Sequence, residues 1–462
     1  MDCFFSQKHF AISYGIKNIE KGDNLNFNVI TLGCKVNQYE SQVMRENLIK
    51  SGYMPSDNKE IADITVINTC TVTSVSDSKN RKLIRRIRRE NPHGIIVLTG
   101  CMPQAFPDDT SLFDGCDIVL GNASRKMLVP SIERYLSNKQ QIIDITEHQN
   151  SGEEFESMAI SDFDERTRAF VKIEDGCNRF CSYCIIPYAR GRVRSKQLSQ
   201  LKEEIETLAQ KGYKEVVLVG INLCAFGQDT GSNLCDAVDV ACAVDGIERV
   251  RLGSIEPEKM DKETIKRLSV QKKFCPQFHL SLQSGCDETL KRMNRHYTSA
   301  EYMEIVKNLS EAFENLAFTT DVMVGFAGET EEEFQKSLDF VKSVGFAKVH
   351  VFSYSRRKGT VADKMPNQVS PEEKDRRSKI MIEETDKSRL GFLASQKGRT
   401  EPVLIETIRR DGFLEGYTKN YTHVKIKINK EDEESFKKHC GTFADVYIES
   451  CEKDCCIGSL VR

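Results

Sequence analysis

Three cysteines in one short loop constrain this chain strongly, because their thiols have to converge on a single centre. Residues 174–184 read EDGCNRFCSYC, and Cys177, Cys181 and Cys184 follow the apolar run AFVKIED. Thiolates bind soft metals, and spacings of two to three residues let one loop wrap one centre. A structural zinc site takes four ligands, and no other His or Cys is nearby in the sequence. We therefore predict a four-iron cluster with one open iron; the alternatives are a zinc site completed from a distant segment, or incidental thiols.

Short β-branched segments alternate with amphipathic helical patterns along most of the chain. From about 26 to 150 the strand candidates are FNVITLGC, DITVINTC, GIIVLTGC and DIVLGN, which predicts an α/β domain with a parallel sheet. From about 166 to 350 there are six more: AFVKIED, EVVLVGIN, RVRLGSIEP, FHLSLQSG, AFTTDVMVG and KVHVFSYS. Six strand–helix repeats predict a barrel or an open part-barrel.

The pattern changes near residue 398, where short strands follow one another without a long helix. PVLIET, FLEGYT, THVKIKI, TFADVYIE and CIGSLV predict a small antiparallel β-barrel. A chain of 462 residues accommodates about three domains. We expect an N-terminal extension over 1–24, the parallel-sheet domain over 25–150, the part-barrel with a charged helical connector over 163–394, and the terminal barrel over 395–462.

Composition narrows the class of protein. The net charge is −3, so a nucleic-acid site would have to be a local patch. No apolar run reaches the roughly 18 residues of a membrane span, and the first residues lack the pattern of a secretory signal. Seventeen cysteines without an export signal favour metal or redox chemistry over disulfides. We therefore expect a cytoplasmic protein without a membrane partner.

Three further cysteines share a position relative to predicted strands. Cys34, Cys70 and Cys101 each come directly after a strand of the N-terminal domain. The carboxyl ends of parallel strands meet at one edge of a sheet, where open α/β sheets bind ligands. We therefore predict that these thiols converge on a second cluster, although cysteine is also a common small buried residue. Cys116 precedes its strand and should lie at the opposite edge.

The segment CNRFCSYC resembles the signature of the radical S-adenosylmethionine (SAM) superfamily, including an aromatic residue before the last cysteine. The resemblance implies that the open iron binds SAM, that an electron from the cluster cleaves it, and that the site lies at the carboxyl ends of the barrel strands. The candidate SAM contacts are Tyr183 and polar or small residues at those strand ends: Gly220, Ile221, Asn222, Ser254, Glu256, Gln283 and Asp321. Some of these could instead only cap strands or helices.

Longer motifs sharpen the resemblance. TLGCKVNQYES, NTCTVTSVSDSKNRK and TGCMPQ resemble the N-terminal domain of the methylthiotransferase family, and HLSLQSGCDETLKRMNRHYT, TTDVMVGFAGETEEEF and HVFSYSRRKGT resemble its radical SAM domain. The terminal barrel resembles a TRAM domain, an RNA-binding module. Within the family, CKVNQYES and NTCTVT are similar to the branch that acts on N6-threonylcarbamoyladenosine in tRNA. Ala327 in place of the usual proline, and CMPQ in place of a tyrosine-containing form, depart from the family pattern.

Membership of this family would imply a tRNA modification enzyme that adds a methylthio group to carbon 2 of N6-threonylcarbamoyladenosine, next to the anticodon on its 3′ side. Its cofactors would be two 4Fe-4S clusters and SAM, which serves as methyl donor and as radical source. Its partners would be the tRNA anticodon loop, an electron donor such as a flavodoxin or ferredoxin, and a sulfur source.

Other functions stay open at this point. The related activities act on isopentenyladenosine in tRNA or on an aspartate of a ribosomal protein. A cobalamin-dependent radical SAM methyltransferase would need an Asp-x-His-x-x-Gly motif, which the sequence lacks. An iron–sulfur protein that binds RNA without catalysis is a further alternative, and anaerobic SAM cleavage would distinguish it from an enzyme.

Three stretches carry cations suited to RNA. Residues 79–89, KNRKLIRRIRR, could neutralise phosphates or simply form a solvated helix face. Arg190, Arg192 and Arg194 alternate just after the cluster loop, where we expect them to contact the substrate or shield the cluster. In GYTKNYTHVKIKI, Lys419, Asn420 and Tyr421 combine a cation with aromatic neighbours, as in proteins that stack RNA bases.

Overall fold

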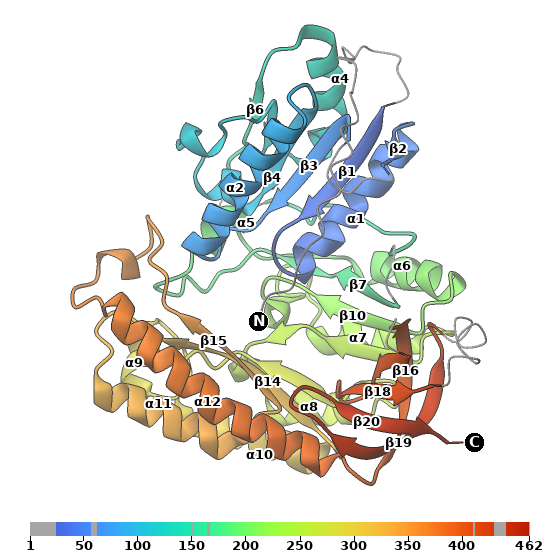
Figure 1. Ribbon diagram of the computed structural model, residues 1–462, viewed down its shortest axis with the longest axis vertical. Coiled ribbons are helices and arrows are strands. Elements are labelled where there is room, and N and C mark those ends of the chain that lie inside the picture. Colours follow the sequence, from blue (N-terminus) through green and yellow to red (C-terminus); the bar gives the residue numbers. More distant parts are fainter. Residues whose placement is uncertain are drawn as a thin grey trace.

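The computed structural model describes residues 25–56, 62–149, 152–163, 167–409, 412–428 and 440–461. The extension predicted over 1–24 lies outside the described residues. Figure 1 shows an α/β sheet domain at the top, a half-open barrel of strands and helices below it, and a small barrel against the side of the half-open one. No described helix has the length and apolar character needed to cross a bilayer.

The N-terminal domain is a parallel sheet in the order β2-β1-β3-β4-β5-β6. Its strands are β1 (Asn26–Thr31), β2 (Met54–Pro55), β3 (Ile64–Thr69), β4 (Ile95–Gly100), β5 (Ile118–Leu120) and β6 (Ile142–Asp144). Helices α1 (Lys35–Lys50) and α4 (Leu128–Asn138) pack on one face, and α2 (Ser74–Glu90) and α3 (Cys101–Ala105) on the other. The strands β3 and β4 are buried along their whole length, as expected for parallel strands covered on both faces.

The central domain is the predicted part-barrel. Its strands are β7 (Arg168–Lys172), β10 (Glu215–Val219), β11 (Arg249–Leu252), β12 (Ser254–Ile255), β13 (Gln277–Leu280), β14 (Ala317–Val324) and β15 (Lys348–Ser353). They form two adjoining parallel sheets, β11-β10-β7 and β12-β13-β14-β15. The outer helices are α6 (Leu198–Gln210), α7 (Leu234–Ala243), α8 (Lys262–Ser269), α10 (Ser299–Ala312) and α11 (Glu331–Val344), three of which begin with a capping box.

A long charged helix leads into the terminal barrel. Helix α12 (Pro371–Ser395) ends shortly before β16 (Thr400–Ile408), which is followed by β17 (Phe413–Tyr417), β18 (His423–Lys427), β19 (Phe443–Cys451) and β20 (Cys456–Leu460). These strands close in the order β16-β17-β18-β20-β19, and every pairing is antiparallel except β18–β20. The barrel is tied to the part-barrel by Arg249, which donates to the carbonyl oxygen of Tyr417 at 3.0 Å.

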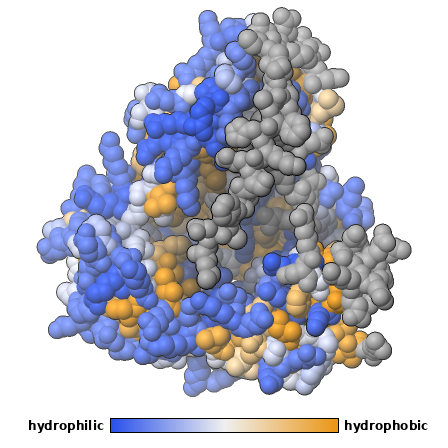
Figure 2. Space-filling model, viewed as in Figure 1, coloured by the Kyte–Doolittle hydropathy of each residue, from blue (hydrophilic) through white to orange (hydrophobic). Residues whose placement is uncertain are grey.

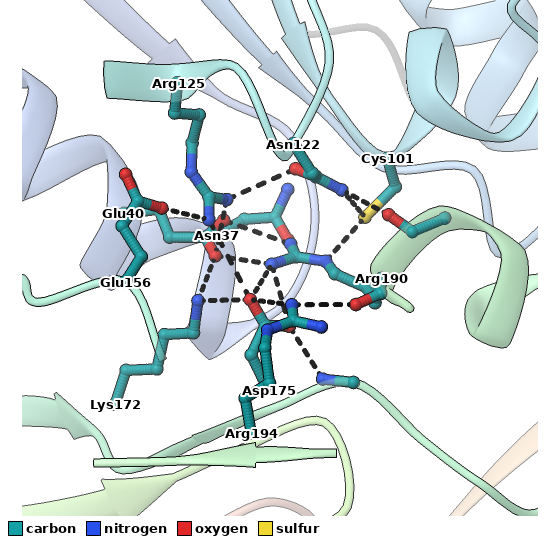
Figure 3. A network of polar contacts seen from close by, with 12 residues as sticks. Asn37, Glu40, Cys101, Asn122, Arg125, Glu156, Lys172, Asp175, Arg190 and Arg194 are labelled. Atoms are coloured by element: carbon teal, nitrogen blue, oxygen red, sulfur yellow. Dashed lines mark hydrogen bonds and ion pairs between the residues drawn. The ribbon is translucent and has the colours of Figure 1, made fainter. Parts of the chain in front are cut away.

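A buried ionic network joins the N-terminal and central domains (Figure 3). Glu40 of α1 is fully buried and pairs with Arg125 and Lys172, each at 2.7 Å, and with Arg190 of the short helix α5 (Ile186–Arg190). Burial would raise the pKa of Glu40, but the three cations hold that pKa at about 2. Its carboxylate is therefore ionised across the physiological range and binds the domains together.

Replacing Glu40 should therefore destabilise the protein. The variant Glu40→Gln leaves three buried cations short of an anion, so we expect the free energy of unfolding to fall by roughly 3–5 kcal/mol. Thermal unfolding under anaerobic conditions measures the loss. The matched control is Glu206→Gln in the exposed pair with Lys202, for which we expect less than about 1 kcal/mol.

The ion pairs of Glu40 also make the stability of the protein depend on pH. Because the pKa of Glu40 is lower in the folded chain than its ordinary value of 4.5, its contribution is complete above about pH 4.5 and declines as the pH falls toward about 2. The stability difference between the native protein and Glu40→Gln should shrink over that window. If the difference in the free energy of unfolding between the two proteins stays constant down to about pH 2, the ionic origin of the effect is contradicted.

Candidate active site

The cysteines of the predicted cluster loop, here called the loop triad, lie together beside the strand ends of the part-barrel. Burial raises the pKa of Cys177 to about 11 and that of Cys184 to about 12, and Cys181 adds to the shift of both. Cys177 Sγ accepts from the amide of Asn222 at 3.8 Å, and Cys181 Sγ accepts from Arg295 Nη1 at 3.4 Å. Donors therefore point at two of the three sulfurs, as they do around a bound thiolate.

The second set, here called the sheet triad, comprises Cys34, Cys70 and Cys101 after β1, β3 and β4. Cys34 and Cys101 both influence the pKa of Cys70, which burial raises to about 12, so the three thiols share one neighbourhood. Cys101 Sγ accepts from Arg190 Nε at 3.2 Å (Figure 3). Cys116 lies elsewhere, in the core at the start of β5.

Glycines make the close approach of these strand ends possible. Gly33 and Gly100, directly before Cys34 and Cys101, adopt positive φ angles of 137° and 102°. A Cβ at Gly33 would come within 2.9 Å of the Cβ of Cys70, and one at Gly100 within 2.4 Å of the Thr69 carbonyl oxygen. A side chain at either position would push the strand ends apart and separate the thiols.

The donor sets suit iron–sulfur clusters. Among the described residues, no group of three or more His, Cys, Asp and Glu side chains is placed to hold a single metal ion. This placement gives no support to a zinc site at either triad. A four-iron cluster is larger than one ion, and its thiolate ligands stand at separate corners. Three sulfur donors, no carboxylate among them, and amide or guanidinium groups directed at the sulfurs fit such a cluster at each triad.

One cavity extends from Cys34 of the sheet triad toward the strand end that lies next to the loop triad. It has a volume of about 880 Å³ and lies inside the open side of the part-barrel, with the terminal barrel closing one end. Cys34 lines it from the N-terminal domain, and Gly220 lines it at the end of β10, two residues from the Asn222 that contacts Cys177. The volume is in the range of sites that enclose small molecules, so a nucleobase would fit.

The candidate SAM contacts occupy different settings. Gly220, Ser254 and Asp321 line the cavity, and Asp321 pairs with His279 at 3.3 Å. Glu256 forms an ion pair with Arg295, the same residue that donates to Cys181. Asn222 is buried near Cys177 and donates its backbone N–H to Glu174 at 2.7 Å.

Tyr183 and Gln283 have settings of their own. Tyr183 is half-buried, and its ring meets that of Phe326 edge-on, with 6.3 Å between centroids. Gln283 has a φ of 65° and shapes a turn through its backbone bond to Asp321.

The arginines after the cluster loop differ from one another. Arg192 is exposed and lies 4.8 Å from the ring of Phe180. Arg190 and Arg194 are buried, because both neutralise Asp175 within the ionic network. These two are therefore not available to RNA. Arg190 contacts Cys101 of the sheet triad, and not a cysteine of the loop cluster that it was expected to shield.

The predicted RNA contacts of the terminal barrel also divide. Asn420 is buried, and its amide donates to the carbonyl oxygen of Asn315 at 3.0 Å, so it serves the domain contact and is not a surface ligand. Lys419 is half-buried and donates to the carbonyl oxygen of Lys272. Tyr421 lines the cavity, stacked on Tyr417 with 4.7 Å between ring centroids.

Several residues of this site carry no recognisable signal in the sequence. Arg295 lies within the motif NRHYT, yet its contact with Cys181 depends on a loop from another strand. Glu174 is fully buried, and burial raises its pKa to about 8. Lys35, beside Cys34, is exposed to the cavity, and desolvation by the cavity walls lowers the pKa of its amine to about 8.

Comparisons with known proteins agree with this geometry. The model of the Radical SAM superfamily matches residues 171–341, and that of Uncharacterized protein family UPF0004 matches residues 26–121. Threonylcarbamoyladenosine tRNA methylthiotransferase MtaB of Aquifex aeolicus is 37% identical over 87% of this chain and 96% of its own length. The protein of that name in Thermotoga maritima is 38% identical over 87% of this chain and 92% of its own.

A relative with another substrate in its name is also similar. The tRNA-2-methylthio-N(6)-dimethylallyladenosine synthase of Caldicellulosiruptor saccharolyticus is 36% identical over 90% of this chain and 89% of its own length. Among solved structures, the radical SAM methyltransferase TsrM from Kitasatospora setae has a TM-score of 0.55 over 73% of this chain and 77% of its own, at 14% identity. That likeness shows the fold alone.

The part-barrel, the loop triad and the matching model define a radical SAM protein. The relatives share more than a third of their residues along most of the chain. The chain belongs to the methylthiotransferase family of radical SAM enzymes.

Each triad should account for half of the iron that the protein binds. We expect Cys34→Ala combined with Cys70→Ala and Cys101→Ala to halve the iron content per chain after anaerobic reconstitution, because only the loop triad remains. Cys116→Ala removes a buried thiol outside both triads and should keep the full iron content. Iron analysis and the absorbance of the clusters measure both. Full iron in the triple variant would contradict a cluster at the sheet triad.

Proposed function

We propose that this enzyme adds a methylthio group to carbon 2 of N6-threonylcarbamoyladenosine, next to the anticodon of tRNA on its 3′ side. The observation that carries the proposal concerns one cavity of nucleobase size. Cys34 of the sheet triad lines it, and it reaches Gly220, two residues from the Asn222 that contacts Cys177 of the loop triad. The relatives named for this reaction support the substrate. Cys177, Cys181 and Cys184 would hold the SAM-binding cluster, and Cys34, Cys70 and Cys101 the auxiliary cluster.

When bound, these groups supply the one-electron cleavage of SAM and the sulfur that is transferred. The chain itself positions and insulates them. Arg295 donates to Cys181 and is held by Glu256, while Arg190 donates to Cys101 and is held by Glu40. A cation at hydrogen-bond distance stabilises a thiolate against protonation. It also offsets the negative charge of a reduced cluster in the protein interior.

The terminal barrel offers bases a stacking surface. Tyr421, Tyr417 and His423 form a continuous stack, with 4.7 Å and 5.1 Å between successive ring centroids, and all three line the cavity. Arg168 lies 4.8 Å and 4.7 Å from the rings of Tyr417 and Tyr421. Aromatic rings backed by a guanidinium group suit the splayed bases of an anticodon loop.

Two partners follow from the chemistry of the proposed reaction. The clusters need an electron donor such as a flavodoxin or ferredoxin, and repeated turnover needs a sulfur source. We propose that the enzyme works in the cytoplasm, where mature tRNA is available.

The reaction is tested by mass spectrometry of tRNA nucleosides. Cells with the native gene should contain the methylthio form of threonylcarbamoyladenosine, and cells without it should accumulate the form unmodified at carbon 2. Loss of the isopentenyl counterpart instead would keep the mechanism and change the substrate. No change in any tRNA nucleoside would overturn the proposal.

Single cysteine variants separate the two clusters. Cys181→Ala should abolish both SAM cleavage and tRNA thiolation, because the loop triad cannot hold its cluster with two thiols. Cys70→Ala should retain SAM cleavage but stop sulfur insertion. Release of 5′-deoxyadenosine under anaerobic conditions measures the first activity, and nucleoside analysis the second. A Cys70→Ala enzyme that still thiolates tRNA would contradict the two-cluster assignment.

Helix α2 offers phosphates a basic face. It begins four residues after Cys70, and Lys79, Lys82, Arg85, Arg86 and Arg89 are exposed along it, whereas Arg88 pairs with Asp117 at 2.5 Å. Figure 2 shows the hydrophilic surface over this part of the N-terminal domain. We propose that this face contacts the tRNA backbone when a base enters the cavity.

Charge removal on α2 should weaken tRNA binding without sequence preference. We expect Lys82→Gln combined with Arg85→Gln to lower affinity by roughly 10-fold at low salt and to reduce the salt dependence of binding by about two phosphate contacts. Filter binding at several salt concentrations measures both. As a control, Lys202→Gln on α6 removes an exposed cation of the central domain and should leave affinity within about 2-fold. An unchanged salt slope in the α2 variant would contradict the contact.

A further inference from the structure

The cavity that Cys34 lines carries an excess of positive charge. Its charged lining residues are four cations and two anions: Lys35, Arg251, Lys348, Arg389, Asp321 and Asp454. Three of them, Arg251, Arg389 and Asp454, are neutralised by an oppositely charged side chain, and Asp321 lies beside an imidazole. Arg251 pairs with Glu215 at 2.9 Å, Asp321 with His279 at 3.3 Å, and Arg389 with Asp454. Within the part of the chain that the structure describes, the two lysines have no carboxylate partner.

Lys35 is the cation nearest in sequence to a predicted cluster ligand. It is the first residue of α1 and follows Cys34 directly, and both residues line the cavity. The amine of Lys35 lies 5.9 Å from the centre of the Phe170 ring. This ring is uncharged and does not neutralise the amine. Arg251, a second cation, lines the same cavity and is already paired with Glu215. An anion placed here would therefore be attracted by Lys35.

We propose that Lys35 binds the carboxylate of the threonylcarbamoyl group and so determines which modified adenine the enzyme accepts. This inference rests on the proposed function. In that nucleoside only N1 and C6 separate carbon 2 from the nitrogen that carries the substituent. A base whose carbon 2 faces the sheet triad therefore holds its carboxylate near the residue adjoining Cys34. An isopentenyl group has no charge and would leave Lys35 unpaired.

Two other anions could also attract Lys35, namely an RNA phosphate and the carboxylate of SAM. The threonyl carboxylate is favoured by position, because Lys35 directly follows Cys34 of the sheet triad, whereas the candidate SAM contact Asn222 reaches Cys177 of the loop triad. A phosphate contact would affect every RNA equally, and a SAM contact would affect no RNA. Binding measurements therefore distinguish the three.

The test uses anticodon stem-loop RNAs that differ only in the base 3′ of the anticodon: adenosine, N6-threonylcarbamoyladenosine or isopentenyladenosine. Dissociation constants are measured anaerobically for the reconstituted enzyme without SAM. We expect the native enzyme to bind the threonylcarbamoyl RNA roughly 10-fold more tightly than the other two, the effect of one charge-assisted hydrogen bond. Lys35→Met should reduce that preference to within about 2-fold while keeping the affinity for the adenosine RNA.

Two matched variants serve as controls. Lys35→Arg keeps the charge and should keep most of the preference. Lys50→Met removes an exposed cation at the other end of the same helix, where Lys50 pairs with Glu46 at 3.6 Å, and should leave the preference unchanged. Full iron content and unaltered affinity for the adenosine RNA show that Lys35→Met is folded.

The outcomes separate this inference from the proposed function. A Lys35→Met enzyme that keeps the preference, or that loses affinity for all three RNAs equally, overturns the role of Lys35. So does a raised KM for SAM with an intact RNA preference. In each case native cells that still contain methylthio-threonylcarbamoyladenosine leave the proposed function standing. If that nucleoside does not depend on the gene, the proposed function itself fails.

Discussion

The buried carboxylate of Glu40, shared by three cations, sets the geometry on which both triads depend. Arg190 binds Glu40 and donates to Cys101, and Lys172 binds both Glu40 and Asp175, which lies two residues before Cys177. Separating the domains would leave several charges buried without partners, which costs several kcal/mol per ion. The ion pairs of Glu40 therefore fix the position of one triad relative to the other. The loops that carry the cysteines do not have to fix it.

The sheet triad follows from the geometry of parallel strands. Cys34, Cys70 and Cys101 are separated by more than thirty residues each, yet β1, β3 and β4 are neighbours in register. Residues at the same end of neighbouring parallel strands meet without any further constraint. Gly33 and Gly100 then remove the side chains that would hold those ends apart. Convergence here results from topology, whereas in the loop triad it results from short spacing.

These differences explain how much could be predicted from the sequence. The three architectures and most of their strands were predictable because periodicity and turn residues are local signals. The short edge strands β2 and β6 were not predicted, and RVRLGSIEP, predicted as one strand, is the two strands β11 and β12 of different sheets. The triads were predictable because each depends on spacing or on strand position. The burial of Arg190 and Asn420 was not predictable. Arg190 follows a cluster loop and Asn420 lies in a segment typical of RNA-binding proteins, and neither position in the sequence indicates that the side chain is buried. Burial of such residues depends on Glu40 and Asn315, which approach from other domains.

The cavity explains why charge is the natural basis for choosing between adenines. Hydrophobic contacts discriminate poorly between substituents of similar size, with about 1–3 kcal/mol for a methylene group. A polar site discriminates more strongly, because a substrate that lacks the matching group leaves the site unpaired. The proposed stacking surface of Tyr417 and Tyr421 would take any flat base and therefore would not select. Selection then rests on the polar lining of the cavity, and Lys35 is the part of that lining which adjoins both the sheet triad and the space for the substituent.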